Sequence, residues 1–208
     1  MTKIRINVYI DGFNLYHSTL QHTYKDCRWL NLFEFSKRLI NPKTEKIQDV
    51  YYFSSIPSWF PDKAKKHLLY IYALRSVGVK DILGKFSIRE RKCPSCNCRY
   101  QTHEEKKTDI NIAITLFADA VADKFDTALI LSGDSDLTPA ITKLKELYPN
   151  KKIGIIVPKG QSAMNLKQHS DFFKKVQSKD LKKSLLPLQV TYNNKIITAP
   201  TGWLPEIK

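Results

Sequence analysis

Glycine is scarce in this sequence, with seven among 208 residues, about half of what an average soluble chain of this length carries. No loop of the GxxxxGK[ST] type is present, which argues against a P-loop nucleotide hydrolase. Long hydrophobic runs are missing as well, since no stretch approaches the roughly 20 apolar residues of a membrane span. The apolar stretch at the N-terminus is too short and too interrupted for a secretory signal. We therefore expect a cytoplasmic protein with no membrane partner.

Acidic residues are outnumbered: 20 Asp and Glu stand against 34 Lys and Arg, for a net charge of +14 and a pI near 9.6. This imbalance favours a polyanionic partner, with nucleic acid ahead of an anionic membrane. A basic protein without such a partner is the alternative. Hydrophobic residues make up 42% of the chain and charged residues 26%, which excludes wholesale disorder. The length predicts one domain, or one domain with an appendage.

Cysteine is rare too, with four in the chain, and in a reducing compartment these are thiols or metal ligands and not a disulfide framework. Cys93-Pro-Ser-Cys96 has the spacing of half a structural zinc site, and such a site needs four ligands. Cys98 and His103 would complete a structural Zn²⁺ site within one loop, with Cys27 as the alternative to Cys98. The other interpretation is a loop of reduced thiols.

β-Branched apolar runs alternate with helix-like spacing along most of the chain. The pattern predicts strands at 4–10, 49–54, within 80–90, 127–132 and 152–157, and helices at 30–40, 61–77, 108–124, 137–147 and 163–176. In the helix at 108–124, Ile110, Ile114, Phe117 and Val121 share one face. Alternating strands and helices predict an α/β fold with a mainly parallel sheet that is covered on both faces.

The domain organisation follows from two places where the composition and the apolar pattern of the sequence change. Residues 1–184 form the α/β domain, and its segment 91–107 is expected as an inserted cysteine-containing finger or loop. Residues 185–208 form a C-terminal extension that contains a small hairpin at 188–198, turning at Asn193-Asn194. This hairpin is expected to cover the edge of the sheet or to pair with a second copy in a homodimer.

Acidic residues follow two of the predicted strands. Asp11 ends the first strand, Asp134 and Asp136 follow the strand at 127–132, and Asp109 opens a helix. The carboxyl ends of parallel strands share one edge of the sheet, so these four side chains are expected to converge. Clustered carboxylates stay ionised together only beside a cation, and hard oxygen ligands suit Mg²⁺ or Mn²⁺. The alternative for each is structural: a turn, a helix dipole partner or an N-cap.

Three segments of the sequence resemble the NYN domain family, which belongs to the PIN-like nuclease superfamily. They are Tyr9-Ile-Asp-Gly-Phe-Asn14, Glu105-Lys-Lys-Thr-Asp109 and Leu131-Ser-Gly-Asp-Ser-Asp136, and the resemblance covers about residues 4–176. It implies a PIN-like, Rossmann-like parallel sheet with helices on both faces. It also implies a metal-dependent ribonuclease that hydrolyses phosphodiester bonds, with RNA as the partner.

The resemblance also implies roles for individual residues. Asp11, Asp109 and Asp134 would bind the metal, and Asp136 would complete the acidic cluster directly or through water. Asn14 would orient the substrate or a metal-bound water. Ser132 and Ser135 are further polar residues that we expect beside the RNA.

Other residues near the motifs are candidates for contacts with RNA. Lys106 and Lys107 directly precede Asp109, where they would meet phosphates without reading sequence. Phe13 and Tyr16 follow Asp11 closely enough to form a wall of the site and stack on an unpaired base. Solvated surface charge and core packing are the alternatives.

These observations lead to three hypotheses of different classes. The first is a metal-dependent ribonuclease, and the second is a non-catalytic RNA-binding module on the same fold. The third is a phosphatase or nucleotide hydrolase that uses the same carboxylates, which would leave the basic segments without a role.

Overall fold

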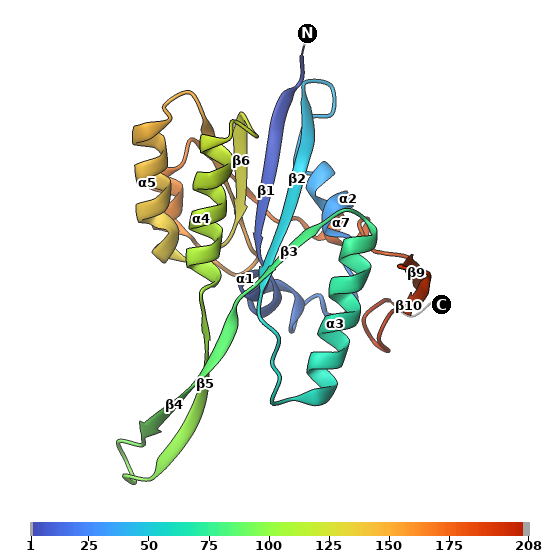
Figure 1. Ribbon diagram of the computed structural model, residues 1–208, viewed down its shortest axis with the longest axis vertical. Helices are drawn as coiled ribbons and strands as arrows, with labels where there is room; N and C mark the ends of the chain where they lie inside the picture. Colours follow the sequence, from blue (N-terminus) through green and yellow to red (C-terminus); the bar gives the residue numbers. More distant parts are fainter. Residues whose placement is uncertain (1, 206–208) are drawn as a thin grey trace.

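The computed structural model describes residues 2–205 and has a six-stranded parallel sheet at its centre (Figure 1). The strand order is β3-β2-β1-β6-β7-β8, and every neighbouring pair is parallel. The strands are β1 (Ile4–Asp11), β2 (Glu45–Ser54), β3 (Lys80–Leu83), β6 (Thr127–Leu131), β7 (Lys152–Val157) and β8 (Phe172–Lys175). The predicted α/β class is confirmed.

Helices cover both faces of the sheet, as Figure 1 shows. The helices are α1 (Gly12–Leu15), α2 (Leu32–Lys37), α3 (Pro61–Ser76), α4 (Thr108–Val121), α5 (Thr138–Leu147), α6 (Met164–His169) and α7 (Ser178–Lys182). One core packs α2, α3 and α7 against the sheet, and the other packs α4, α5 and α6. Successive residues of β1 alternate between the two cores, with Val8 in the first and Tyr9 in the second, because side chains alternate along a strand.

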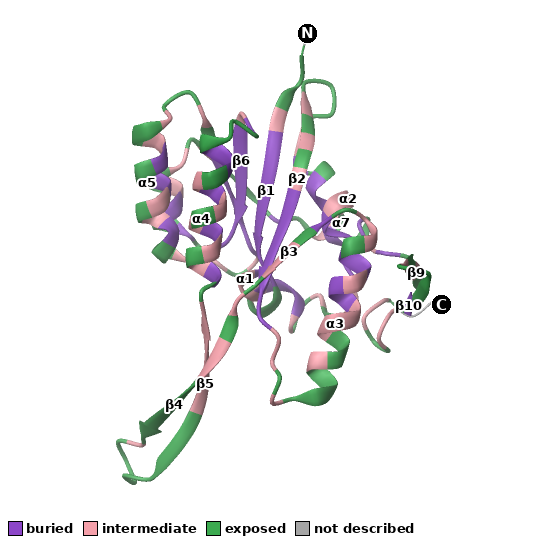
Figure 2. Ribbon diagram, in the orientation of Figure 1, coloured by how far each residue is buried: buried purple, intermediate pink, exposed green. Residues whose placement is uncertain are grey.

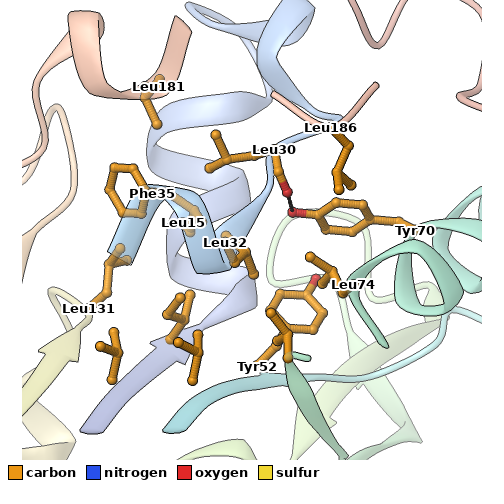
Figure 3. Packing of buried hydrophobic residues seen from close by; sticks show 14 of the residues in the cluster. Leu15, Leu30, Leu32, Phe35, Tyr52, Tyr70, Leu74, Leu131, Leu181 and Leu186 are labelled. Carbon is orange, nitrogen blue, oxygen red and sulfur yellow. Dashed lines mark hydrogen bonds between the residues drawn. The ribbon is translucent and has the colours of Figure 1, made fainter. Parts of the chain in front are cut away.

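Burial follows the same layers: the central strands are buried along most of their length (Figure 2). Figure 3 shows the first core, where Leu15, Leu32 and Leu74 pack together and the Tyr70 hydroxyl donates to the Leu30 carbonyl at 2.8 Å. In the second core, the buried Asp119 of α4 accepts hydrogen bonds from the Asn7 amide at 3.0 Å and the Tyr9 hydroxyl at 2.9 Å. These bonds hold α4 against β1.

Segment 91–107, predicted as an inserted finger or loop, is part of a two-stranded antiparallel hairpin, β4 (Lys85–Lys92) and β5 (Arg99–Lys106). We call it the arm. It forms no pairs with the main sheet and extends away from the body of the molecule (Figure 1). The sequence did not predict the strand at 99–106, because the arm is highly charged and poor in aliphatic residues and its strands lack the buried face that sequence patterns reveal.

Two further expectations are corrected. The predicted helix at 163–176 ends at His169, and residues 172–175 pair with β7 as the edge strand β8. Sheet pairing overrides the local helical pattern there. On α4, Ile110, Ile114 and Val121 do share a side, but they are 60%, 63% and 70% exposed, while Ile112 and Leu116 are buried.

The C-terminal hairpin is confirmed as β9 (Gln189–Tyr192) and β10 (Lys195–Thr198). Asn193 and Asn194 both have positive φ, as a tight hairpin turn of the type I′ kind requires. The hairpin packs against α3, where the rings of Tyr72 and Tyr192 stack at 6.0 Å, and does not lie along the sheet edge. No helix within residues 2–205 is long and apolar enough to cross a membrane.

Candidate active site

Asp11 is the last residue of β1, and its side chain is 4% exposed. Its Oδ1 accepts a hydrogen bond from the Asn14 backbone N–H at 2.9 Å, which caps α1, and its Oδ2 accepts from the Ser132 hydroxyl at 3.0 Å. Position 12 requires glycine, because the Cβ of any other residue there would lie 2.5 Å from the Tyr52 ring. The end of β1 thus holds one buried carboxylate in a fixed orientation.

The loop after β6 carries the second acidic group. Asp134 accepts the Asp136 N–H at 3.0 Å, and its own N–H donates to the Ser132 hydroxyl at 3.1 Å. The Asn14 side-chain oxygen accepts the Gly133 N–H at 2.9 Å. These bonds join the loops that follow β1 and β6, so the two motifs are one structural unit at the carboxyl edge of the sheet.

Asp109 lies in the first turn of α4, and Glu105 lies near the end of β5. The Glu105 carboxylate accepts from the Ser55 hydroxyl at 2.8 Å and from the Thr108 hydroxyl at 2.6 Å. The sequence prediction omitted Glu105 as a site residue, although it belongs to the second motif. Glu105 lies in a segment without periodic apolar residues, so the sequence did not indicate where its side chain would lie.

The electrostatics show that the acids affect one another. Burial raises the pKa of Asp11 to about 6, and the charges of Asp109 and Asp134 add to this, against the lowering by the Asn14 and Ser132 hydrogen bonds. Burial also raises the pKa of Asp109 to about 6, together with the charges of Asp134, Glu105 and Asp136. The predicted acidic residues therefore do converge on one region.

This donor set suits a hard divalent cation because it consists of carboxylate oxygens with no compensating positive partner in their own hydrogen bonds. Within residues 2–205, no three His, Cys, Asp or Glu side chains lie close enough together to ligate one ion directly. Magnesium commonly keeps several waters and uses one or two carboxylates. The residues fit an ion held partly through water.

The remaining predicted polar residues divide by burial. Ser132 is fully buried and positions Asp11, so its expected contact with RNA is wrong. Ser135 and Asp136 are exposed, and Ser135 lines a shallow hollow of about 230 Å³ beside Gly133. Asn14 uses its oxygen for the Gly133 N–H, which leaves its Nδ2 to meet a substrate or a water.

The two lysines before Asp109 differ from each other. Lys106 forms an ion pair with Glu104 at 3.1 Å. Lys107 is exposed and has a backbone φ of 81°, a strained conformation for a non-glycine residue. Strain of this kind is often found at functional sites. Of the two residues, Lys107 is the better placed to meet a phosphate.

An aromatic cluster lies between α1 and the base of the arm. The Phe13 and Phe86 ring centroids are 5.5 Å apart, those of Trp59 and Phe86 4.4 Å, and Trp59 and His103 stack at 3.8 Å. Tyr16 is 36% exposed. Phe13 is thus half-buried in a cluster that attaches the arm beside the acids, and Tyr16 is the ring presented to solvent.

The structure separates the four expected zinc ligands. His103 pairs with Ile88 and stacks on Trp59, whereas Cys93, Cys96 and Cys98 lie at the tip of the arm. Four residues of extended strand, about 13 Å, separate His103 from Arg99 at the last strand pair. Cys27 is buried in the main core, and burial raises its pKa to about 11. Neither residue joins the cysteines at the tip.

The sequence and the fold are similar to those of known proteins. The model of the NYN domain family matches residues 5–177, a range that contains all the acids described above. A crystal structure of a protein of unknown function from Vibrio parahaemolyticus RIMD 2210633 has the same fold, with a TM-score of 0.56 and 22% identity. The match covers 88% of this chain and 97% of that one.

A 6-hydroxy-3-succinoylpyridine 3-monooxygenase from Pseudomonas putida is 24% identical to this chain. The alignment covers 98% of this chain and 77% of the monooxygenase.

Proposed function

This chain belongs to the NYN domain family, and from that premise we propose that it is a metal-dependent ribonuclease. One observation carries the proposal: Asp11 and Asp109 come from separate elements, and the pKa of each is raised by burial and then by the negative charge of the other acids. A fold gains no stability from such a group of like charges. It is maintained where a cation and a polyanionic substrate are to be bound.

Each residue has a part in this proposal. Asp11, Asp109 and Asp134 would hold Mg²⁺ or Mn²⁺ partly through bound water, and Asp136 and Glu105 would act only through water. Such an ion, when bound, activates water and stabilises charge at the phosphorus. Ser132 and the Asn14 N–H fix the orientation of Asp11.

The RNA-binding surface in this proposal lies between the acids and the arm. Lys107 would neutralise a phosphate beside Asp109, and Tyr16 would stack on an unpaired base. The net charge of +14 supports a polyanionic substrate. A small phosphate ester would leave this charge without a role, which disfavours the phosphatase hypothesis.

The experiment is cleavage of labelled single-stranded RNA in Mn²⁺, in Mg²⁺ and in EDTA. We expect cleavage in either metal, none in EDTA, and a loss of at least about 100-fold in Asp134→Asn, because the lost charge weakens metal binding. Glu146→Gln is the matched control: this carboxylate is exposed near the end of α5, where it pairs only with Lys143. Equal cleavage by wild type and Asp134→Asn would refute the assignment.

Binding of RNA without cleavage in any metal would favour a non-catalytic RNA-binding module. A third outcome is suggested by the monooxygenase relative, whose alignment covers 98% of this chain. Oxidation of 6-hydroxy-3-succinoylpyridine, with O₂ consumed in the presence of a reductant, would support that class. No such turnover is expected here.

A further inference from the structure

The tip of the arm has a defined backbone conformation. The Cys93 N–H donates to the Cys98 carbonyl at 2.9 Å, and the Asn97 N–H donates to the Cys93 carbonyl at 2.9 Å. Asn97 has a φ of 59°, in the left-handed region that a tight knuckle needs. The bond between Asn97 and Cys93 closes a tight turn that contains Cys96, so both cysteines of the Cys93-Pro-Ser-Cys96 segment belong to one turn.

A CxxC segment on a tight turn is the arrangement from which structural zinc sites take two of their four ligands, and cysteine binds the metal as its thiolate. Cys96 and Cys98 are exposed, and Cys93 is half-buried. The two cysteines of this segment are therefore accessible to a metal at the tip.

One copy of the chain cannot complete a tetrahedral site at this tip. Structural zinc takes four ligands, and within residues 2–205 no three ligating side chains converge. His103 is held against Trp59, and Cys27 is in the core. The missing ligands must come from another molecule.

We propose that the tips of two copies of this chain bind one Zn²⁺ between them, with Cys93 and Cys96 of each copy as the four ligands. Each thiol loses its proton as its Zn–S bond forms, so four protons are released per zinc and nothing is oxidised or reduced. The inference does not depend on the proposed ribonuclease activity.

The surroundings favour a second copy as the partner. The arm extends away from the body, so its tip can meet an identical tip without collision between the two bodies (Figure 1). Four thiolates and one Zn²⁺ carry a net charge of −2. Arg91, Lys92 and Arg99 flank the cysteines on each copy. Arg91 and Arg99 form ion pairs with Glu104 and Glu90, so Lys92 of each copy supplies the positive charge that offsets the charge of the zinc site.

The test measures zinc content and molar mass on the reduced full-length protein, by elemental analysis and by light scattering after size exclusion. We expect one zinc per two chains and twice the chain mass of 24.1 kDa, reverting to monomer in EDTA. Cys93→Ser and Cys96→Ser should each give zinc-free monomers with an unchanged melting temperature. Substitution by Co²⁺ should produce the absorption bands of a tetrahedral thiolate site.

Two control variants sharpen the result. Cys27→Ala, which removes a thiol from the core, and Cys98→Ser should both keep the zinc and the dimer. A monomer with one zinc per chain, a loss of zinc in Cys98→Ser, a chain that takes up no zinc, or a dimer that persists in EDTA would each overturn the proposal.

Discussion

Several site residues each perform two tasks. Asp11 caps α1 and Asp134 caps the turn after β6, so both accept backbone N–H groups. A capping role and a charged role are compatible because a carboxylate has two oxygens and about four acceptor positions. The sequence offered Asp136 as the N-cap, and the structure places Asp134 at that position instead. Capping by Asp11 and Asp134 does not exclude a functional role for either.

At this scale the raised pKa of Asp109 predicts a pH-dependent stability. Its folded pKa of about 6 exceeds the ordinary 3.8, so the folded state binds the extra proton between these values. Stability of the metal-free protein should then fall as pH rises from about 4 to about 6. In EDTA at pH 7.5, Asp109→Asn should raise the melting temperature by about 2–4 °C, for roughly 1 kcal/mol after allowance for solvent screening.

Calorimetry at two pH values and with added Mn²⁺ checks this prediction. At pH 4 the variant and the wild type should melt together, since the wild-type carboxyl is then protonated in the folded state. Mn²⁺ at pH 7.5 should stabilise the wild type more than the variant. A lower melting temperature of Asp109→Asn in EDTA at pH 7.5 would contradict the proposed repulsion.

At the scale of elements, the attachment of the arm to the body depends on the contacts at its base. Gly84 lies between β3 and β4, where a Cβ would lie 2.6 Å from the Lys106 carbonyl oxygen, so the two strands of the arm come close together as they leave the body. Beyond that point, Glu104 joins them through ion pairs with Arg89 and Arg91. These pairs are exposed and contribute little to stability. The aromatic cluster must therefore supply most of the anchoring.

Trp59→Ala should loosen the arm and leave the body intact. The substitution removes the stack on His103 and the contact with Phe86. Hydrogen exchange should accelerate in residues 85–106 by at least about tenfold, for a loss of 1.4 kcal/mol or more, with little change in β1 or β7. Tyr100→Ala is the control, since Tyr100 is 48% exposed near the tip. Uniform acceleration throughout the protein would mean that Trp59 supports the whole fold.

At the scale of the whole molecule, charge governs the expected encounter with RNA. The acids at the carboxyl edge of the sheet repel RNA phosphates. The excess of basic residues must therefore attract the RNA strongly enough to offset that repulsion. Binding of single-stranded RNA should weaken with salt, with a slope of log K against log salt near −0.7 per phosphate contact.

Lys107→Gln should make that slope shallower by about 0.7, because it removes one phosphate contact beside Asp109. Lys43→Gln is the matched control: Lys43 is exposed in the turn before β2, at the opposite edge of the sheet. Fluorescence anisotropy over a salt series measures both slopes. Equal slopes for the two variants would show that the charge of Lys107 acts only at long range.

The sequence by itself determined where β1, β2, β3, β6 and β7 lie along the chain and the position of Asp11, Asp109 and Asp134 at element ends. Apolar runs and turn residues are local signals, so they can be read without knowledge of the fold. The NYN resemblance rested on the same short segments and is confirmed by the family match over residues 5–177.

Only the tertiary structure decided which face α4 buries, that the cysteine segment is the tip of a hairpin, and that residues 172–175 form an edge strand. It also decided that Ser132 orients Asp11 and that Glu105 accepts hydrogen bonds from Ser55 and Thr108 beside Asp109. Each of these depends on contacts between segments far apart in the chain: Ser132 lies 121 residues from Asp11. Local propensity carries no information about such contacts, because their energy exists only once the sheet has assembled.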